Sequence, residues 1–212
     1  MKIALFGNEF SSSYIKYINH LITKLESENV ELIIHHKFHE FLQGSIDFSE
    51  ETKTFERITA DDNIDFLFSI GGDGTLLKAV TYVRESNIPI LGINTGRLGF
   101  ISSISTDQIE VAVDNVLKGE YKIRRRTVLQ LETENNLFGT SNFALNEVAI
   151  VKKDTSSMIR IDAFIDDEFL NSYWADGLLI STPTGSTGYS LSCGGPIILP
   201  GTENIIIAPI AP

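Results

Sequence analysis

The first half of the chain alternates short apolar runs with segments in which apolar residues recur at helical spacing. Tyr14, Ile18 and Leu25 belong to one such helical segment, which follows the serines at 11–13. Because helices between short apolar strands form parallel sheets, the pattern predicts an α/β domain with ligands at the carboxyl ends of its strands. The expected strands are 3–6, 30–34, 64–70 and 88–93, and the expected helices are 14–25, one ending near 84, and 106–117.

The pattern changes after residue 119, where long β-rich segments replace the alternation of strands and helices. Turn signals at 135–136 and 166–167 separate these segments, as in antiparallel sheets. We therefore expect an α/β domain over 1–120 and an antiparallel β-rich domain over 121–212. The expected β segments are 121–134, 138–152, 158–165, 169–174 and 178–181.

The composition is that of a globular protein, with 42% hydrophobic and 21% charged residues in a chain of 212. A net charge of −11 argues against nucleic-acid binding, which usually requires a basic face. The single cysteine, Cys193, excludes an internal disulfide framework, and no apolar stretch approaches membrane-spanning length. Since 1–6 has the pattern of a strand rather than of a signal peptide, we expect a cytoplasmic protein that binds neither nucleic acid nor membrane.

Residues 71–75, with the sequence GGDGT, connect an apolar strand to a helix that continues through Leu76. Glycines and a helix N-terminus present backbone N–H groups to one spot, which is typical of phosphate binding. Asp73 is unexpected there, because a carboxylate repels phosphate. It either caps the helix in ordinary Asp-Gly turn chemistry or takes a proton from a hydroxyl that attacks a phosphoryl group. An anion at this turn would also need local cations such as Lys78, Arg97 or a bound Mg²⁺.

A second glycine-rich segment, 181–189, is too dense in hydroxyl side chains for a core strand. Pro183 stiffens this loop before a helix that is expected to begin near Ser186. Tyr189, in the first turn of that helix, either stacks on a purine while the hydroxyls read the base edge, or packs in the core.

Several other chemistries are excluded because their motifs are missing. The chain has no G-x-x-x-x-G-K-[ST] loop, no G-x-G-x-x-G fingerprint and no G-x-S-x-G turn at Ser186. The histidines lack the spacing of a metal site, and those at 35, 36 and 39 are expected on a partly exposed helix edge. The arginines at 124–126 are expected on a solvated face or at a subunit contact.

Five segments of the chain occur in the order and approximate spacing of the NAD kinases, and the resemblance covers nearly the whole chain. GGDGT is also found in diacylglycerol kinases, sphingosine kinases and phosphofructokinases, whereas NTGRLGF and TPTGSTGY are much more specific. The five segments are GGDGT at 71–75, NTGRLGF at 94–100, LNE at 145–147, Asp176-Gly177 before the strand 178–181, and TPTGSTGY at 182–189.

The resemblance implies a parallel-sheet α/β domain like that of NAD and diacylglycerol kinases, followed by an antiparallel β-rich domain. It also implies transfer of the γ-phosphoryl group of ATP, or in some members of polyphosphate, to the 2′-hydroxyl of the adenosine ribose of NAD, which gives NADP. Mg²⁺ or another divalent cation would be carried with ATP. A homo-oligomer, either a dimer or a tetramer, is expected.

The same resemblance assigns roles to individual residues. Asp73 would be the catalytic general base, Asn146 and Glu147 would hold ribose hydroxyls, and Thr187 and Tyr189 would contact adenine. Asp176 matches an acid that approaches the nicotinamide end, in family oligomers often from a neighbouring subunit. The phosphate-binding set is Gly71, Gly72, Thr75 and Arg97, and the remaining NAD-binding residues are Gly74, Phe100, Thr184, Gly188 and Ser192.

The chain departs from the family at Gly188, where many members have alanine, and at Ile101, where some members place an aromatic residue. Family members also continue beyond Pro212 for several more strands, so the β-rich domain is expected to be incomplete. Two alternatives remain open. One is an inactive nucleotide-binding remnant of this fold, and the other is a lipid kinase of the diacylglycerol type that shares only 71–75.

Overall fold

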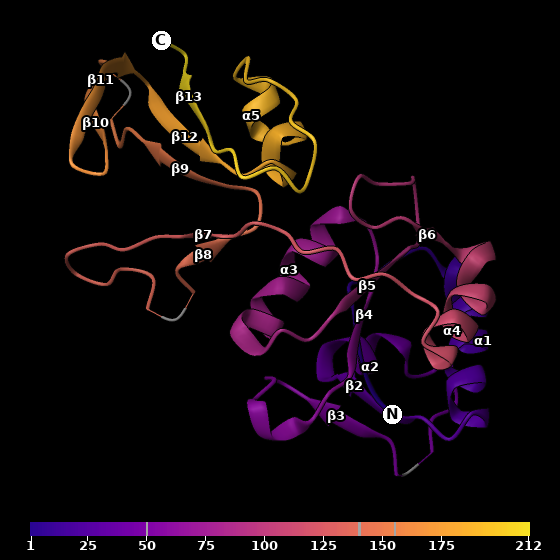
Figure 1. Ribbon diagram of the computed structural model, residues 1–212. Helices are drawn as coiled ribbons and strands as arrows, with labels where there is room; N and C mark the ends of the chain where they lie inside the picture. The colour runs from indigo at the N-terminus through magenta and orange to yellow at the C-terminus, as the bar shows by residue number, and fades with distance from the viewer. Residues whose placement is uncertain (50, 140, 155) are drawn as a thin grey trace. The chain divides into compact units, whose positions relative to one another are not determined.

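The computed structural model of the protein describes residues 1–49, 51–139, 141–154 and 156–212. The chain divides into two compact units, 1–123 and 124–212 (Figure 1). The first unit contains a parallel sheet with helices, and the second consists mainly of antiparallel strands. Both features agree with the fold class expected from the sequence.

Among the described residues, the first unit is built on a six-stranded sheet whose neighbouring strands all run parallel. The strand order β3-β2-β1-β4-β5-β6 sets β1 beside β4, with Gly7 opposite Ile70. The carboxyl ends of these two central strands therefore meet at one edge, where parallel sheets bind ligands. The strands are β1 (Lys2–Gly7), β2 (Glu31–His35), β3 (Lys53–Phe55), β4 (Phe66–Ile70), β5 (Ile90–Asn94) and β6 (Ile104–Ser105).

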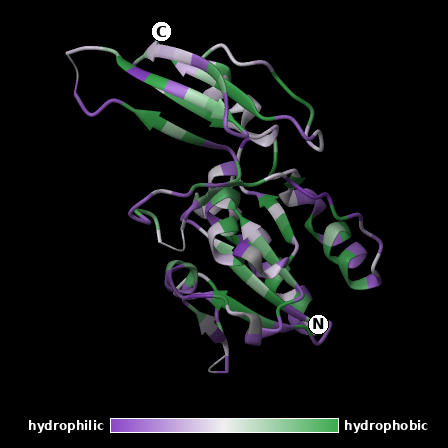
Figure 2. Cartoon of the chain, turned by 60° about the vertical axis from the view of Figure 1, so that its left-hand side comes forward, coloured by the Kyte–Doolittle hydropathy of each residue, from purple (hydrophilic) through white to green (hydrophobic). Residues whose placement is uncertain are grey.

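Helices cover both faces of this sheet, and Figure 2 shows hydrophobic residues along its strands and mixed character along its helices. One face packs against α1, α2 and α4, and the other packs against α3. The ion pair between Lys24 Nζ and Asp114 Oδ1, 2.6 Å long, joins α1 to α4. The helices are α1 (Ile15–Ser27), α2 (His36–Leu42), α3 (Asp73–Val83) and α4 (Ile109–Lys118), and short 3-10 turns occupy Ser12–Tyr14, Ala60–Asp62, Arg84–Ser86 and Thr106–Gln108.

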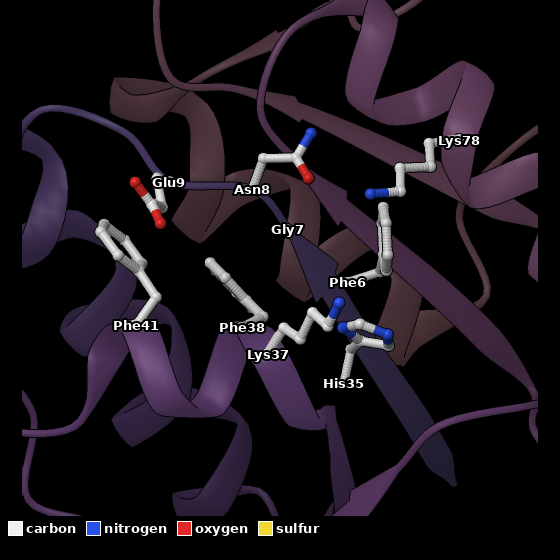
Figure 3. Close-up of a pocket in the computed structure, with 9 residues that line it drawn as sticks. All are labelled: Phe6, Gly7, Asn8, Glu9, His35, Lys37, Phe38, Phe41 and Lys78. Atoms are coloured by element: carbon white, nitrogen blue, oxygen red, sulfur yellow. The ribbon is translucent and has the colours of Figure 1, made fainter.

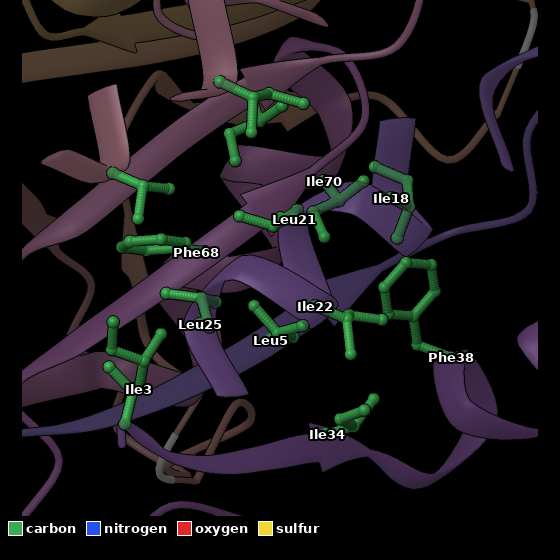
Figure 4. Packing of buried hydrophobic residues seen from close by; sticks show 14 of the residues in the cluster. Ile3, Leu5, Ile18, Leu21, Ile22, Leu25, Ile34, Phe38, Phe68 and Ile70 are labelled. Carbon is green, nitrogen blue, oxygen red and sulfur yellow. The ribbon is translucent and has the colours of Figure 1, made fainter. Parts of the chain in front are cut away.

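The apolar run of β1 is continuous because both faces of this strand are buried. Ile3 and Leu5 pack in the core on the α1 side, whereas Ala4 and Phe6 pack on the α3 side. Figure 4 shows Ile3 and Leu5 among the side chains that α1 contributes at helical spacing. Each fully buried side chain of this size contributes about 1.5–3 kcal/mol to the stability of the fold.

His35 corrects the expectation of a partly exposed histidine edge. It ends β2 rather than lying on a helix, and it is only 4% exposed. Its ring packs against Phe6, with centroids 5.1 Å apart, and the Tyr82 hydroxyl lies 3.0 Å from its Nε2. The pKa of His35 is lowered to about 4, mainly by burial and also by the neighbouring positive charges of His36, Lys78 and Lys37, whereas Glu56 opposes the shift. The imidazole is therefore neutral at physiological pH.

This buried histidine makes stability depend on pH. The pKa of His35 is about 4 in the folded protein and 6.5 when unperturbed, so the unfolded chain binds more protons between these values. We expect the free energy of unfolding to fall by about 1–2 kcal/mol as the pH falls through this window, and His35 to have no influence above it. Urea unfolding of the protein and of His35→Gln at several pH values measures this. His20→Gln is the control, because His20 is exposed. An unchanged pH slope in His35→Gln would contradict the assignment.

The second unit contains a three-stranded antiparallel sheet of order β13-β12-β9 and a long hairpin, β10-β11. A short pair, β7-β8, precedes them along the chain. Their bounds are β7 (Leu129–Gln130), β8 (Phe143–Ala144), β9 (Glu147–Val151), β10 (Ile159–Ile165), β11 (Glu168–Ala175), β12 (Gly177–Ser181) and β13 (Ile206–Ile210), and a 3-10 turn over Thr184–Thr187 precedes α5 (Tyr189–Ser192).

Three local expectations for this unit were wrong in extent. The segment 121–134 contains only the two-residue strand β7, because alternating side chains form a strand only where a neighbour completes the hydrogen-bond ladder. In 138–152, strands begin at Phe143 and Glu147, and position 140 lies outside the described residues. The helix expected from Ser186 begins at Tyr189, since Gly188 has a non-helical backbone (φ −90°, ψ −135°) that interrupts the turn.

Within the described ranges, no helix has both the length and the apolar character needed to cross a membrane.

Candidate active site

Asp73 is the first residue of α3, but it does not cap that helix. The N-cap is Gly72, which makes no side-chain capping bond. The Asp73 carboxylate instead accepts three backbone hydrogen bonds from the loop that follows β5. Its Oδ2 accepts from the N–H of Phe100 at 2.8 Å, and its Oδ1 accepts from those of Ile101 at 3.1 Å and Ser102 at 2.9 Å. The carboxylate thus fastens the NTGRLGF segment to the glycine turn.

This arrangement leaves the carboxylate one unused position. The two oxygens of an ionised carboxyl offer about four acceptor positions, and the loop occupies three of them. The remaining lone pair is on Oδ2. A hydroxyl group that approaches this oxygen finds an acceptor whose orientation is already set by the backbone.

The glycine turn has one glycine that the backbone requires and two that leave open space. Gly71 has a φ of +148°, and a Cβ there would lie 2.2 Å from Thr75 Oγ1. A Cβ at Gly72 or Gly74 would meet nothing within 4 Å. Thr75 is buried and its Oγ1 accepts a hydrogen bond from Asn8 Nδ2 at 3.1 Å. The turn is therefore rigid on its protein side and open on the side where an anion can approach the N-terminus of α3.

Asn94 closes the base of the loop after β5. Its buried side chain accepts a hydrogen bond from the Gly96 N–H at 2.7 Å and donates to the Arg97 carbonyl at 3.0 Å. The fully buried Ser102 closes the other end, where its Oγ donates to the Gly71 carbonyl at 3.1 Å. Arg97 itself is exposed, and the Phe100 side chain is 77% exposed.

Sequence reasoning missed Ser102 and the particular role of Gly99. A Cβ at Gly99 would lie 2.0 Å from Asp73 Oδ1, so only glycine lets the loop approach the carboxylate. The second glycine of NTGRLGF, Gly99, is the residue that marks such a close approach in the sequence. Ser102 gave no signal beyond being a small polar residue soon after the motif.

The second unit brings the LNE segment against the hydroxyl-rich loop. Thr182 Oγ1 donates to the Leu145 carbonyl at 2.6 Å, and the Thr182 N–H donates to the Asn146 carbonyl at 2.9 Å. Gly185 packs so closely that a Cβ there would lie 2.2 Å from the same Asn146 oxygen. These contacts hold Asn146 and Glu147 at a fixed position beside the loop.

Two polar atoms of this segment are buried without a hydrogen-bond partner among the described residues, Asn146 Oδ1 and Glu147 Oε2. Burial raises the pKa of the Glu147 carboxyl, and a hydrogen bond from the Tyr189 backbone N–H opposes that rise. A Cβ at Gly188 would lie 3.1 Å from Glu147 Oε2, which makes alanine tight at this position. Unpaired buried oxygens are rare in folded proteins, and a ligand with donor groups satisfies them.

The other NAD-binding candidates differ in their surroundings. Thr184 is buried, Thr187 is half-buried, Ser192 is exposed, and Tyr189 is 44% exposed. The exposure of Tyr189 argues against a core role. Asp176 forms a 2.6 Å ion pair with Lys152 and lies at the opposite end of β12 from the 182–189 loop. The five-residue strand separates them by about 16 Å at the usual rise per residue, so the structure does not bring Asp176 together with Tyr189.

In the part of the chain that the structure describes, no group of three His, Cys, Asp or Glu side chains is placed to hold a metal ion.

The chain matches two protein-family models. Residues 3–121 match the ATP-NAD kinase N-terminal domain, and residues 145–212 match the ATP-NAD kinase C-terminal domain. Among curated relatives, the NAD kinase of Cytophaga hutchinsonii is 49% identical over 213 residues, and that of Christiangramia forsetii is 44% identical over 215 residues. In both cases the alignment covers 100% of this chain and 73% of the relative.

Solved structures show the same similarity. Yeast NADH kinase complexed with NADH has a TM-score of 0.84 and 27% identity, and an NAD kinase from Archaeoglobus fulgidus in complex with ATP has a TM-score of 0.74 and 28% identity. Each alignment covers 100% of this chain, which spans 66% of the yeast chain and 73% of the archaeal one. The family models span more than half of the chain and the curated relatives exceed 40% identity. The chain therefore belongs to the NAD kinase family.

Proposed function

We propose that the protein is an NAD kinase that transfers the γ-phosphoryl group of ATP to the 2′-hydroxyl of the adenosine ribose of NAD. The observation that carries this proposal is the Asp73 carboxylate, held by three backbone N–H groups beside an open glycine turn. Family membership and the NADH and ATP present in the similar solved structures support it.

In the proposed reaction, Asp73 Oδ2 accepts the proton of the 2′-hydroxyl as its oxygen attacks the γ-phosphorus. A bond forms between the ribose oxygen and phosphorus, the bond from phosphorus to the bridging β,γ-oxygen breaks, and ADP leaves with the bonding electrons. Backbone N–H groups at Gly72 and Gly74 and the N-terminus of α3 stabilise the charge on the phosphoryl oxygens, with Gly71, Thr75 and Arg97 completing the phosphate-binding set.

The second unit supplies the groups that hold the dinucleotide. We assign Asn146 and Glu147 to ribose hydroxyls, because their unpaired oxygens accept hydrogen bonds from such groups. Thr187 and the exposed ring of Tyr189 are assigned to adenine. Asp176 is assigned to the nicotinamide end.

The donor is proposed to be ATP with its Mg²⁺, and polyphosphate is the alternative donor. The divalent cation is proposed to enter the site with the phosphate groups of ATP, as part of the substrate. A cytoplasmic location and a homo-oligomeric state, either a dimer or a tetramer, are also part of the proposal.

A coupled assay for NADP formation tests this function directly. The protein is incubated with NAD, ATP and Mg²⁺, and NADP is detected with an NADP-specific dehydrogenase. Time-dependent NADP formation supports the proposal. Binding of NAD without NADP formation would identify an inactive nucleotide-binding protein instead, and phosphorylation of diacylglycerol in a parallel reaction would indicate a lipid kinase.

Tyr189→Ala is expected to weaken NAD binding about fivefold, which corresponds to roughly 1 kcal/mol for a lost stacking surface. Leu191→Ala is the matched control, because Leu191 lies on the same short helix and is also 44% exposed. Calorimetric titration with NAD and thermal unfolding are measured for both variants. An unchanged NAD affinity in Tyr189→Ala together with a lowered melting temperature would mean that the ring serves folding rather than binding.

A further inference from the structure

A pocket of about 150 Å³ lies at the carboxyl edge of the sheet, beside the ends of β1 and β2 (Figure 3). Phe6 and Asn8 come from the end of β1 and the residues just after it, His35 from the end of β2, and Lys37 and Lys78 from α2 and α3. All of these residues belong to the first unit. Among them, only Lys78 was named above as a local cation for an anion at the glycine turn, and the others have no role in the proposed reaction.

The pocket is next to the glycine turn. Asn8, which lines the pocket, donates its hydrogen bond to Thr75 in that turn, and Gly7 pairs with Ile70, the residue before the turn. Lys78 lies one helical turn beyond Gly74 on α3. A molecule whose end reaches the turn can therefore extend past Asn8 and Lys78 into the pocket.

The polar side of the pocket is suited to an anion. Lys37 and Lys78 both lie close enough to His35 to lower its pKa, and neither forms an ion pair with any described residue. Figure 3 shows both lysine side chains extending toward the space beside Phe6 and His35. Glu9 is an acidic member of the lining and offsets one of the two lysine charges, so a net positive charge remains.

A buried polar atom in the pocket wall independently indicates a ligand. His35 is only 4% exposed and lines the pocket, and its Nδ1 has no hydrogen-bond partner among the described residues. Its Nε2 is already engaged by the Tyr82 hydroxyl. A ligand oxygen in the pocket would satisfy this nitrogen.

The apolar side of the pocket is formed by Phe6, Phe38 and Phe41. Phe6 and Phe38 are each only 1% exposed, so the half-buried ring of Phe41, stacked on Phe38 with centroids 6.4 Å apart, presents the aromatic surface. Aromatic surfaces bind the flat rings of nucleobases. A bare polyphosphate chain has no group that would gain from this surface.

We propose that this pocket, called here the donor pocket, binds the part of the nucleoside triphosphate that is not transferred. The phosphates lie along Lys78 and Lys37, the base contacts the ring of Phe41, and the γ-phosphoryl group reaches the turn at 71–75. The inference rests on the proposed function, and it selects a nucleoside triphosphate rather than inorganic polyphosphate as the donor.

ATP binding to the full chain, measured by calorimetry with Mg²⁺ and without NAD, tests the cationic side. Lys37→Gln and Lys78→Gln should each weaken ATP binding about tenfold, as expected for one lost charge-assisted contact. Lys122→Gln is the matched control. Lys122 is exposed, and its neighbour Tyr121 packs on Phe66 at the start of β4, the opposite edge of the sheet. Unchanged ATP affinity in the double variant, or no ATP binding by the parent protein, overturns the proposal.

Phe41→Ala tests the aromatic side, with inorganic tripolyphosphate as the second probe. ATP affinity should fall about fivefold while tripolyphosphate affinity stays the same, because only ATP has a base to lose contact. An equal loss for both probes would overturn recognition of the base. The two proposals can fail separately. If the protein forms NADP but the lysine variants bind ATP as tightly as the parent protein, only the donor pocket is refuted. If the lysine variants bind ATP more weakly but the parent protein forms no NADP, only the kinase activity is refuted.

Discussion

Asp73→Asn is expected to lower the rate of NADP formation by about a hundredfold to ten-thousandfold, the usual contribution of a general base. Asparagine matches the size of aspartate, but its amide has one acceptor oxygen and does not take up the proton of the ribose hydroxyl. Steady-state kinetics give the rate, and calorimetric titration should show NAD binding largely intact. Near-normal turnover with an unchanged pH dependence would falsify the role of Asp73 as base.

The same substitution also weakens the attachment of the loop. Asparagine keeps only one acceptor oxygen, and its NH2 group cannot accept the backbone hydrogen bonds made at the other carboxylate oxygen. Ser102→Ala separates the two roles. It removes the bond from Ser102 Oγ to the Gly71 carbonyl but keeps the carboxylate and its backbone donors. If Ser102→Ala lost as much activity as Asp73→Asn, loop position rather than proton transfer would account for the loss.

Gly99→Ala is expected to reduce NADP formation by about a hundredfold or more, an effect in the range of losing the base itself. The new Cβ would lie 2.0 Å from Asp73 Oδ1, so either the loop or the carboxylate must move. A displacement of about 1 Å at a catalytic group is enough for such a loss. The rate is measured in the coupled assay, and thermal unfolding checks that the fold is retained.

Gly96→Ala provides the matched control in the same loop. A Cβ there would approach only Asn94 Oδ1, at an ordinary contact distance of 3.8 Å. This variant should keep most of the activity. Equal losses in Gly96→Ala and Gly99→Ala would mean that the loop tolerates no side chain at all, and the contact with Asp73 would then not be the cause.

Most of the fold follows from local patterns in the sequence. Burial on both faces of a central strand produces continuous apolar runs such as that of β1, and burial of one helix face produces the spacing seen in α1. The segment 121–128 has β-rich residues but forms no strand, because no neighbouring strand pairs with it among the described residues. Strand formation depends on a partner that a local pattern does not contain.

The sequence by itself determined the alternation of strands and helices, the glycine turn at 71–75, and the motifs that mark the family. These are local features, because periodicity and turn chemistry act over a few neighbouring residues. Only the tertiary structure decided that Asp73 anchors a loop 27 to 29 residues away, that His35 is buried, and that Asn8, Lys37 and Lys78 line one pocket. Each of these contacts depends on the order and register of the parallel strands, which bring the carboxyl ends of distant segments to one edge of the sheet.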